Sequence, residues 1–570
     1  MKHNIIRFLL PMAALFSLSA AAQVKMSKLL KAEGVEVVYQ SSDKGKPLSP
    51  RTILQSKAHE VAVFSETGNN ASPTSEAEAR HRAVIKTYLD LNSSQATLVA
   101  DMPDGKTASA VTAFSQNEAD FKEIGREKIL GISCRVVRTV LNSNTYDLWV
   151  AEGLPFRGTP QYMLGVPRGL VLKIVRNGDR VQQAVSLTPK SLNTPLLPSQ
   201  RGRQMPTAEF QHALRQSRVI NVRVFEEERV CFDGSKLPRP DSLLSDRVYR
   251  CGGGSIILKK VKLPASSAGR HVFVELAQYS DGDAYDRTGS VFIIPTGKEK
   301  TFLDAIHRLQ DVPAFESNGE AYHGLVSTPL YDAPMELMRF ITGFGVRKFN
   351  HVKVPGQTWV DSVVYKTDVT ALSDRLQGEV WVGAYIGNWD KNGHKVSLTL
   401  KFHPSGSDAQ PRVLPLFNTV NYLEQAGQPY PEFLGKDSLR VKFRLDQSVE
   451  RATLFYLTTG HGGWGGGDEF NPKPNTIMLD GRKVIEFVPW RDDCGTYRNM
   501  NPCTGNFDNG LSSSDYSRSN WCPASVTNPE YIPLGALEAG EHEIVIKIPQ
   551  GQREGASISY WCLSGTLICH

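Results

Sequence analysis

The chain has 570 residues, of which 22% are charged, and its formal net charge is +6. A charge this small, without a concentrated stripe of Lys and Arg, argues against nucleic acid as a main partner. After the first residues, no stretch approaches the roughly 20 consecutive apolar residues that a membrane span requires, so a membrane-embedded protein is not expected.

The first 22 residues have the pattern of a cleavable secretory signal. Lys2 and Arg7 form a short basic region, an apolar stretch follows, and small residues precede Gln23. Removal of the two basic residues lowers the net charge from +6 to +4. We therefore predict an exported protein, periplasmic or secreted, whose mature chain begins near Gln23.

Residues 23–190 are predicted to form an N-terminal accessory domain of the α+β class. One helix is expected at residues 75–91, "SEAEARHRAVIKTYLDL", where Ser75 and Glu78 form a capping-box pattern ahead of an apolar stripe. The remainder is strand-like, with runs such as "CRVVRTVL" and "YDLWVAEG" between turn residues. The following segment, residues 191–215, begins with a proline-rich stretch that is typical of a linker.

Short strands dominate after residue 215. Runs such as "RHVFVELAQYS" and "SLRVKFRLD" recur with almost no amphipathic helix between them, which favours antiparallel sandwiches or jelly rolls. A second seam lies near residues 403–415. We therefore expect a mainly β protein with two adjacent eight-stranded jelly-roll domains, at residues 216–404 and 405–570. A single, unusually long barrel is the alternative.

The cysteines fall into clusters. Five of the eight lie in the last eighty residues, and Cys231 and Cys251 are close in sequence. In an exported protein such clusters favour disulfides. Zinc is the alternative interpretation, although the C-terminal gaps are not those of CxxC pairs. Cys134 stands alone and is expected to be a buried thiol.

The stretch "GHGGWGGGDEF", residues 460–470, begins where the predicted strand "RATLFYLTTG" ends. A phosphate-binding glycine loop needs a following helix, but a proline-containing turn and a strand follow here, so a nucleotide site is not expected. Glycines let a ligand approach the backbone closely, and Trp464 offers a flat face for a sugar ring. The alternative is a flexible loop with a solvated carboxylate pair, Asp468 and Glu469.

The stretch "SDGDAYDRTGSVFIIP" places Asp281, Asp283 and Asp286 just before a strand. Their spacing resembles a fragment of a calcium loop, but the glycine and the distal glutamate of an EF-hand are misplaced. Asp286 and Arg287 form either a surface ion pair of little energetic value or a general base tuned by its neighbour.

The stretch "DYSRSNWCPA" places Arg518 and Trp521 beside Cys522. A disulfide at this cysteine would hold both side chains in a rigid loop, where an arginine suits a carbonyl oxygen or a sugar hydroxyl. A half-buried tryptophan next to a surface arginine is the alternative.

Together, the three stretches resemble motifs of the peptide-N-glycosidase F family, bacterial amidases that release N-linked glycans from asparagine. "DAYDR" resembles the family's "DEWDR", "GHGGWGGGDEF" resembles its glycine-rich "GWGH" stretch followed by "AEW", and "YSRSNWCPA" resembles "DRAGWCPG". The resemblance runs from about residue 220 to the end and implies two jelly-roll domains with the site at their interface. Residues 24–190 resemble the extra N-terminal domain of longer Bacteroidetes-type members.

The resemblance also implies catalytic roles for three residues. Asp286 would be the general base for the attacking water, Glu469 would position the substrate and help to protonate the leaving amine, and Arg518 would stabilise the charge on the carbonyl oxygen. No metal or other cofactor is required. The implied partners are N-glycosylated proteins and glycopeptides, and the protein is expected to be a monomer. Substrate contacts are expected from Asp283, Arg287, Trp389, His461, Trp464 and Trp521.

One family glutamate, at the end of a "TETW" strand, has no counterpart, because the matching stretch "YIGNW" contains Gly387, Asn388 and Trp389. Asn388 and Asp390 are candidates to replace it.

Two other functions are alternatives to the amidase. The first is a non-catalytic, lectin-like glycan-binding protein that uses the same acids and tryptophans. The second is a copper-dependent monooxygenase, which would need grouped histidines, and this chain has no HH or HxH pair.

Overall fold

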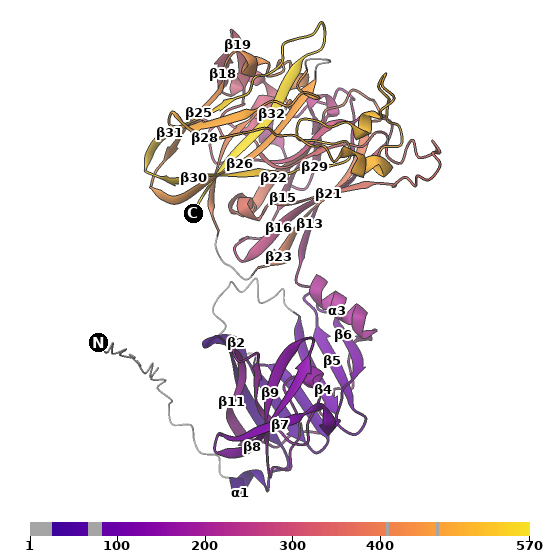
Figure 1. Cartoon of the computed structure of the whole chain (residues 1–570), viewed down its shortest axis with the longest axis vertical. Helices are drawn as coiled ribbons and strands as arrows, with labels where there is room; N and C mark the ends of the chain where they lie inside the picture. Colours follow the sequence, from indigo (N-terminus) through magenta and orange to yellow (C-terminus); the bar gives the residue numbers. More distant parts are fainter. Residues whose placement is uncertain (1–25, 67–82, 406–409, 463–466) are drawn as a thin grey trace, which may run out of the picture. The chain divides into compact units, whose positions relative to one another are not determined.

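The computed structural model describes residues 26–66, 83–405, 410–462 and 467–570 (Figure 1). The chain forms two compact units, Met1–Arg218 and Val219–His570. Each hydrophobic core cluster draws its residues from one unit only, so each unit has a core of its own. The predicted secretory signal lies outside the described residues.

The first unit is built on one 12-stranded sheet in which neighbouring strands are antiparallel, except for the parallel pair β12 and β6. In sheet order the strands are β12 (Arg203–Gln204), β6 (Thr107–Ala113), β5 (Gln95–Asp101), β4 (Val84–Asp90), β3 (Glu60–Ser65), β2 (Lys46–Lys57), β1 (Val35–Asp43), β11 (Arg180–Pro189), β10 (Val171–Arg176), β9 (Asn144–Ala151), β8 (Ile132–Leu141) and β7 (Lys122–Ile129). Two α-helices are described in this unit, α1 (Met26–Leu29) and α3 (Thr207–Gln216).

The helix expected at residues 75–91 is wrong over its second half. Residues 84–90 form strand β4, which pairs with β3 on one side and β5 on the other. The sequence of this strand, "VIKTYLD", is rich in β-branched and aromatic residues, which suit a pleated surface. Pairing on both edges outweighs the helical periodicity seen in the sequence. Residues 75–82 lie outside the described residues.

The segment 191–215, expected to be a linker, is not a linker throughout. Its last part belongs to helix α3, in which Phe210 and Leu214 are buried. These two side chains are four residues apart, so they lie on one face of the helix, and they pack against Leu98 and Ala110 of the sheet. The helix is therefore part of the first unit.

The second unit begins with a sandwich of two antiparallel sheets, here called the first sandwich. One sheet has the order β13 (Ile220–Val230), β23 (His394–Pro404), β16 (Arg270–Ser280) and β21 (Val363–Asp368). The other has the order β14 (Val248–Cys251), β15 (Ile256–Lys262), β22 (Glu379–Ile386), β17 (Thr288–Ile294), β20 (Met335–Ile341) and β29 (Val526–Thr527). These sheets hold more than the eight strands expected, because β14 and β29 add short edge strands.

The second sandwich packs two further antiparallel sheets. One has the order β24 (Arg412–Asn418), β32 (Ser559–Cys569), β26 (Val449–Gly462) and β30 (Glu530–Leu537). The other has the order β25 (Leu439–Leu445), β31 (Gly540–Lys547), β27 (Asn475–Leu479) and β28 (Arg482–Phe487). The hairpin β18 (Ala314–Ser317) and β19 (Glu320–His323) and the helix α4 (Phe302–His307) complete this unit. The expected mainly β fold is confirmed.

Several strands where the two sandwiches meet are buried on both faces. Every residue of β20 is buried, and β20 lies against β32 and β24 of the second sandwich. Arg339 of β20 and its partner Glu336 are fully buried there; Arg339 donates to Thr459 and to the carbonyl of Cys562, and Glu336 accepts from Ser564. Because residues of the second sandwich satisfy the hydrogen-bonding groups of this buried charged pair, the pair fixes how the two sandwiches pack against each other.

The cysteine expectations are met in part. Cys494 and Cys522 form a disulfide, and Cys134 is a buried thiol as predicted. The other cysteines are free, so the disulfide expected from the closeness of Cys231 and Cys251 is wrong.

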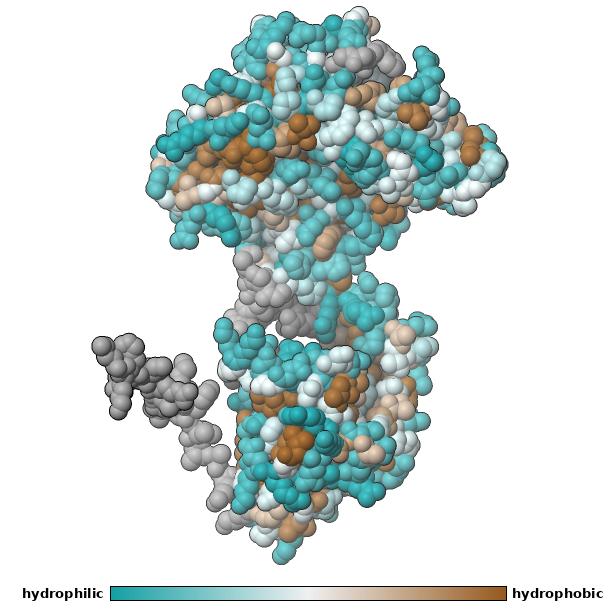
Figure 2. Space-filling view, in the orientation of Figure 1, coloured by the Kyte–Doolittle hydropathy of each residue, from teal (hydrophilic) through white to brown (hydrophobic). Residues whose placement is uncertain are grey.

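No helix of the described residues is long and apolar enough to cross a membrane. Hydrophilic residues cover most of the face shown in Figure 2.

Candidate active site

Asp286 lies in the turn between β16 and β17. Asp283 builds this turn, because its side chain accepts from the backbone N–H of Tyr285 and its carbonyl accepts from Ser280 Oγ. Asp286 stands two residues before β17 begins, and its side chain is 16% exposed. The local sequence therefore places this carboxylate at the start of a buried strand.

Glu469 lies just past the glycine-rich stretch at the end of β26. A Cβ at Gly460 would collide with Trp561 and Ser519, and Gly462 has a φ of +76° where a side chain would collide with Ile558. The glycines therefore permit close approach of neighbouring backbones. Glu469 N–H donates to the carbonyl of Gly462 at 3.3 Å, which holds the carboxylate near the strand end.

Arg518 joins the two carboxylates. Its Nε donates to Glu469 Oε1 at 3.1 Å, and its Nη2 lies 3.8 Å from Asp286 Oδ2. The remaining donors are held by Tyr516 O and Ser513 Oγ, both at 3.0 Å. Because its side chain is only 1% exposed, Arg518 lies behind the carboxylates and not on a cavity wall.

The pKa values of both carboxyl groups are raised. Burial is the main cause for Asp286, while Arg518 and Arg287 act in the opposite direction. Burial also raises the pKa of Glu469 to about 7; Arg518 lowers it, and the nearby charge of Asp286 raises it further. A pair of neighbouring acids whose pKa values are both raised by burial is suited to acid–base chemistry.

Arg287 is held by a buried carboxylate. Its Nε and Nη2 donate to Asp283 at 2.8 and 3.3 Å, and its Nη1 has no partner among the described residues. His394 Nε2 lies 3.5 Å from the same carboxylate. Burial would raise the pKa of Asp283, but His394 and Arg287 hold it well below its usual range. Asp283 was expected to contact substrate, but it is 2% exposed, does not line the cavity and contacts Arg287 and His394 instead.

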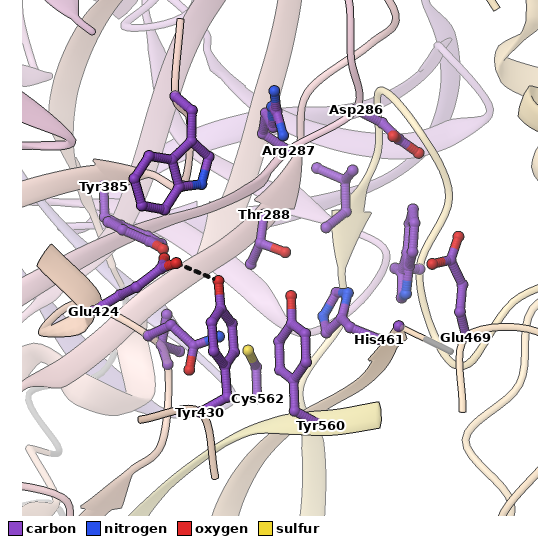
Figure 3. A pocket seen from close by; sticks show the side chains of 17 residues that line it. Asp286, Arg287, Thr288, Tyr385, Glu424, Tyr430, His461, Glu469, Tyr560 and Cys562 are labelled. Atoms are coloured by element: carbon purple, nitrogen blue, oxygen red, sulfur yellow. Dashed lines mark hydrogen bonds between the residues drawn. The ribbon is translucent and has the colours of Figure 1, made fainter. Parts of the chain in front are cut away.

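Asp286, Arg287 and Glu469 border a cavity of about 240 Å³ within the second unit. Asp286 and Glu469 lie at one end, and Glu424 and Tyr430 lie at the other (Figure 3). Between them the walls are polar and aromatic, a combination that suits the binding of a sugar ring. The wall residues include Arg287, Thr288, Tyr385, Trp389, Asn421, His461, Trp521, Tyr560 and Cys562.

His461, at the end of β26, is a neutral side chain in this wall. Its ring stacks between Trp521 and Tyr560, with ring centroids 5.3 and 5.2 Å away. Burial lowers its pKa to about 3, and Arg339 and Arg518 act in the same direction. Trp521 is fixed by its own hydrogen bond to the carbonyl of Gly460, at 2.8 Å, and by the neighbouring disulfide.

Three family profiles match the chain. "Peptide-N-glycosidase F, N terminal" matches residues 221–402, "Peptide-N-glycosidase F, C terminal" matches residues 429–568, and "N-glycanase peptide, N-terminal domain" matches residues 37–201. Two solved structures of PNGF-II, in space groups P21 and C2, are each 39% identical to the chain. The first covers 94% of this chain and 99% of its own with a TM-score of 0.75; the second covers 95% and 98% with a TM-score of 0.69.

The chain belongs to the peptide-N-glycosidase F family. The expected family assignment is thereby confirmed, including the N-terminal domain found in PNGF-II. No curated protein sequence matches the chain.

Neither candidate for the missing family glutamate reaches the cavity. Asn388 is buried and donates to the carbonyl of Ile386, and Asp390 accepts from the backbone N–H groups of Asn392 and Gly393. Both side chains therefore stabilise the turn after β22. Gly387 and Trp389, on either side of Asn388, do line the cavity, and Trp389 is 54% exposed.

Glu424 is the residue that the sequence analysis missed. Tyr430 OH donates to its Oε1 at 2.6 Å, and burial raises the pKa of Glu424. It lies in the connection after β24, in the stretch "YLEQAGQPYPE", which carries no motif. Only the position of this connection against the first sandwich shows that a third carboxylate faces the cavity.

Trp464 and Asp468, which belong to the glycine-rich stretch, are not among the described residues of the cavity wall. Trp464, expected to contact substrate, lies outside the described residues. Asp468 is fully buried, accepts from Trp561 Nε1 at 2.7 Å and from Gly551 N–H at 2.9 Å, and so anchors the stretch. Among the described residues, no group of three or more His, Cys, Asp or Glu side chains could hold a metal ion.

Proposed function

We propose that the chain is a peptide-N4-(N-acetyl-β-glucosaminyl)asparagine amidase. It would hydrolyse the amide bond between asparagine and the first GlcNAc of N-glycans, convert asparagine to aspartate and release the glycan as a glycosylamine. The observation that carries this proposal is the pairing of Asp286 and Glu469 by one buried arginine at the end of an aromatic cavity, in a chain of this family.

Asp286 and Glu469 divide the proton transfers. Asp286, as general base, takes a proton from a water molecule, whose oxygen then attacks the carbonyl carbon of the side-chain amide. Glu469 is partly protonated near neutral pH because its pKa is about 7, so it can give a proton to the leaving nitrogen as the C–N bond breaks. Arg518 keeps both carboxyl groups in place.

Arg287 is the cation best placed to stabilise the charge that develops on the carbonyl oxygen. It lines the cavity with Nη1 unpaired, whereas every donor group of Arg518 already has a protein acceptor or faces Asp286. Asp283 fixes the plane of the Arg287 guanidinium, so the donor does not need to reorganise during the reaction. This replaces the role first expected for Arg518.

The rest of the cavity suits the sugar. Tyrosine and tryptophan rings offer flat faces to the apolar side of a pyranose, and Glu424, paired with Tyr430, offers acceptor oxygens to hydroxyl or N-acetyl groups. The predicted secretory signal and the Cys494–Cys522 disulfide support export of the protein.

The test is incubation of the purified protein with a denatured N-glycoprotein, followed by mass analysis of both products. Release of the intact glycan with asparagine converted to aspartate is expected. A GlcNAc that stays on the asparagine would instead identify an endoglycosidase and overturn the proposal.

Variants separate the amidase from a lectin-like protein. Asp286→Asn should lower kcat by about a hundredfold to ten-thousandfold, the usual contribution of a general base, while glycopeptide binding is retained. Asp281→Asn is the control, because Asp281 lies in the same turn but pairs with Arg229 outside the cavity. Binding without any release by the unaltered protein would favour the lectin-like function.

A further inference from the structure

Asp286, Gly462 and Glu469 border a second hollow besides the cavity described above. This hollow has a volume of about 830 Å³ and is also bordered by Tyr285, Phe470 and the loop at residues 503–508. The carboxylate pair therefore stands between two spaces. A substrate whose scissile amide joins two different parts, a sugar and a polypeptide, needs a space on each side of the reacting atoms.

The loop that borders the second hollow is held to the reaction centre. Ser513 N–H donates to the carbonyl of Gly505 at 2.8 Å, and Phe507 N–H donates to the carbonyl of Leu511 at 2.9 Å, so the segment folds into a closed turn. Ser513 Oγ also accepts from Arg518 Nη2. The loop is thus positioned by the same arginine that holds the two carboxylates.

Aromatic rings form one side of this hollow. Phe507 lies edge-on to Phe470 and Tyr516, with ring centroids 5.5 and 4.4 Å apart, and Arg518 lies 5.0 Å from the centre of the Phe470 ring. Tyr285, which also borders the hollow, is 61% exposed. Phe470 and Phe507 are half-buried. Aromatic rings next to accessible loop backbone are features that recognise an extended peptide.

The ionisable side chains that border this hollow are acidic. Asp286, Glu469 and Asp508 border it, and no Lys, Arg or His does so among the described residues. The first cavity differs, because Arg287 lines its wall. Asp286 and Glu469 are paired with Arg518, which leaves Asp508 as the acidic side chain that a flanking residue would meet. An acidic residue beside the glycosylated asparagine would meet a like charge there, and a basic residue an opposite one.

We propose that the second hollow is the polypeptide subsite. It binds the chain that flanks the glycosylated asparagine in an extended form, with Phe507 as the apolar contact, and it selects neutral or basic flanking residues over acidic ones through Asp508. This inference rests on the proposed amidase function, in which the first cavity holds the sugar.

The experiment compares kcat/KM for three substrates that carry one glycan. Two are glycopeptides that differ only in having Lys or Glu beside the asparagine, and the third is asparagine with blocked amino and carboxyl groups. The unaltered protein should prefer the Lys peptide over the Glu peptide by about tenfold. Asp508→Asn should reduce this preference.

Phe507→Ala should lower the ratio of kcat/KM for the Lys peptide to that for the blocked asparagine by about tenfold, mainly through KM. Leu511→Ala is the matched control, because Leu511 is 53% exposed on the same loop and does not border the hollow. It should leave the ratio unchanged.

Equal losses on all three substrates in the Phe507 variant would mean that Phe507 only shapes the reaction centre, and would overturn the subsite. Equal kcat/KM for all three substrates with the unaltered protein would also overturn it and leave the amidase function intact. No release from any substrate would instead overturn the proposed function itself.

Discussion

Glu469 is the titrating group that should limit the rate on the alkaline side. It must carry a proton to protonate the leaving nitrogen, and its pKa is raised by burial to about 7. We predict that kcat/KM falls as the pH rises above about 7, with an apparent value that belongs to the coupled pair with Asp286. The measurement is a pH–rate profile. A profile without a fall in this range would contradict the role of Glu469.

The same pKa predicts an effect on stability. Because the pKa of Glu469 is higher in the folded protein than its ordinary 4.5, the folded state binds the proton more tightly, and stability is lost as the pH rises from 4.5 through about 7. Glu469→Gln should therefore raise the free energy of unfolding above pH 7, by at most about 3 kcal/mol, and have little effect below pH 4.5. Denaturant titrations above pH 7 and below pH 4.5 measure the free energy of unfolding of the unaltered protein and of the variant. Glu541→Gln, an exposed position, is the control.

His461 should act as a neutral hydrogen-bond donor. Thr459 Oγ1 accepts from Arg339 Nη1 at 3.2 Å and lies 2.7 Å from His461 Nε2. We assign the hydroxyl hydrogen of Thr459 to His461 Nε2, which leaves the ring proton on Nδ1. His461→Asn keeps a donor near the position of Nδ1, whereas His461→Gln places it near Nε2. We predict about tenfold higher kcat/KM for the Asn variant. Equal rates would show that the ring only fills space.

At the scale of elements, the loop between Cys494 and Cys522 carries much of the site. It contains Ser513 and Arg518, and its disulfide joins residues 28 positions apart. Closing a loop of this length stabilises the fold by about 3 to 4 kcal/mol in the chain-entropy model. Replacing both cysteines with serine should lower Tm and lower kcat/KM, because Arg518 loses its fixed position. Thermal unfolding and activity of this variant are the measurements.

The free thiol Cys503 provides the control for that variant. It lies in the same loop and is not bonded, so Cys503→Ser should change Tm much less than the double substitution. An equal loss of Tm in both would mean that the disulfide contributes little.

Some strands can be predicted from the local sequence alone, and other elements cannot. The alternation in "RHVFVELAQYS" and "SLRVKFRLD" predicts β16 and β25, because one face of each strand is buried, while the other is mostly half-buried in β16 and exposed in β25. The predicted helix fails at β4, where two neighbouring strands supply the hydrogen bonds. Helix α3 was missed for the related reason that its face is buried only against a sheet formed much earlier in the chain.

At the scale of the whole molecule, all residues that border the two hollows belong to the second unit. This unit has its own hydrophobic cores, so it should fold without the first. We predict that residues 219–570, produced alone, unfold cooperatively and retain most of the kcat/KM of the full chain on a small glycopeptide. A fragment that folds but releases no glycan would show that the first unit contributes to catalysis.

The sequence by itself determined the mainly β class, the family and the stretches that hold Asp286, Glu469 and Arg518, because strand periodicity and short motifs are local properties of the chain. Only the tertiary structure decided that these three side chains meet, that Arg518 is buried behind the carboxylates, and that Glu424 faces them across the cavity. The reason is that the burial of these side chains depends on how the two sandwiches pack, and their pKa values follow from that burial. This packing brings together residues that are more than a hundred positions apart in the sequence.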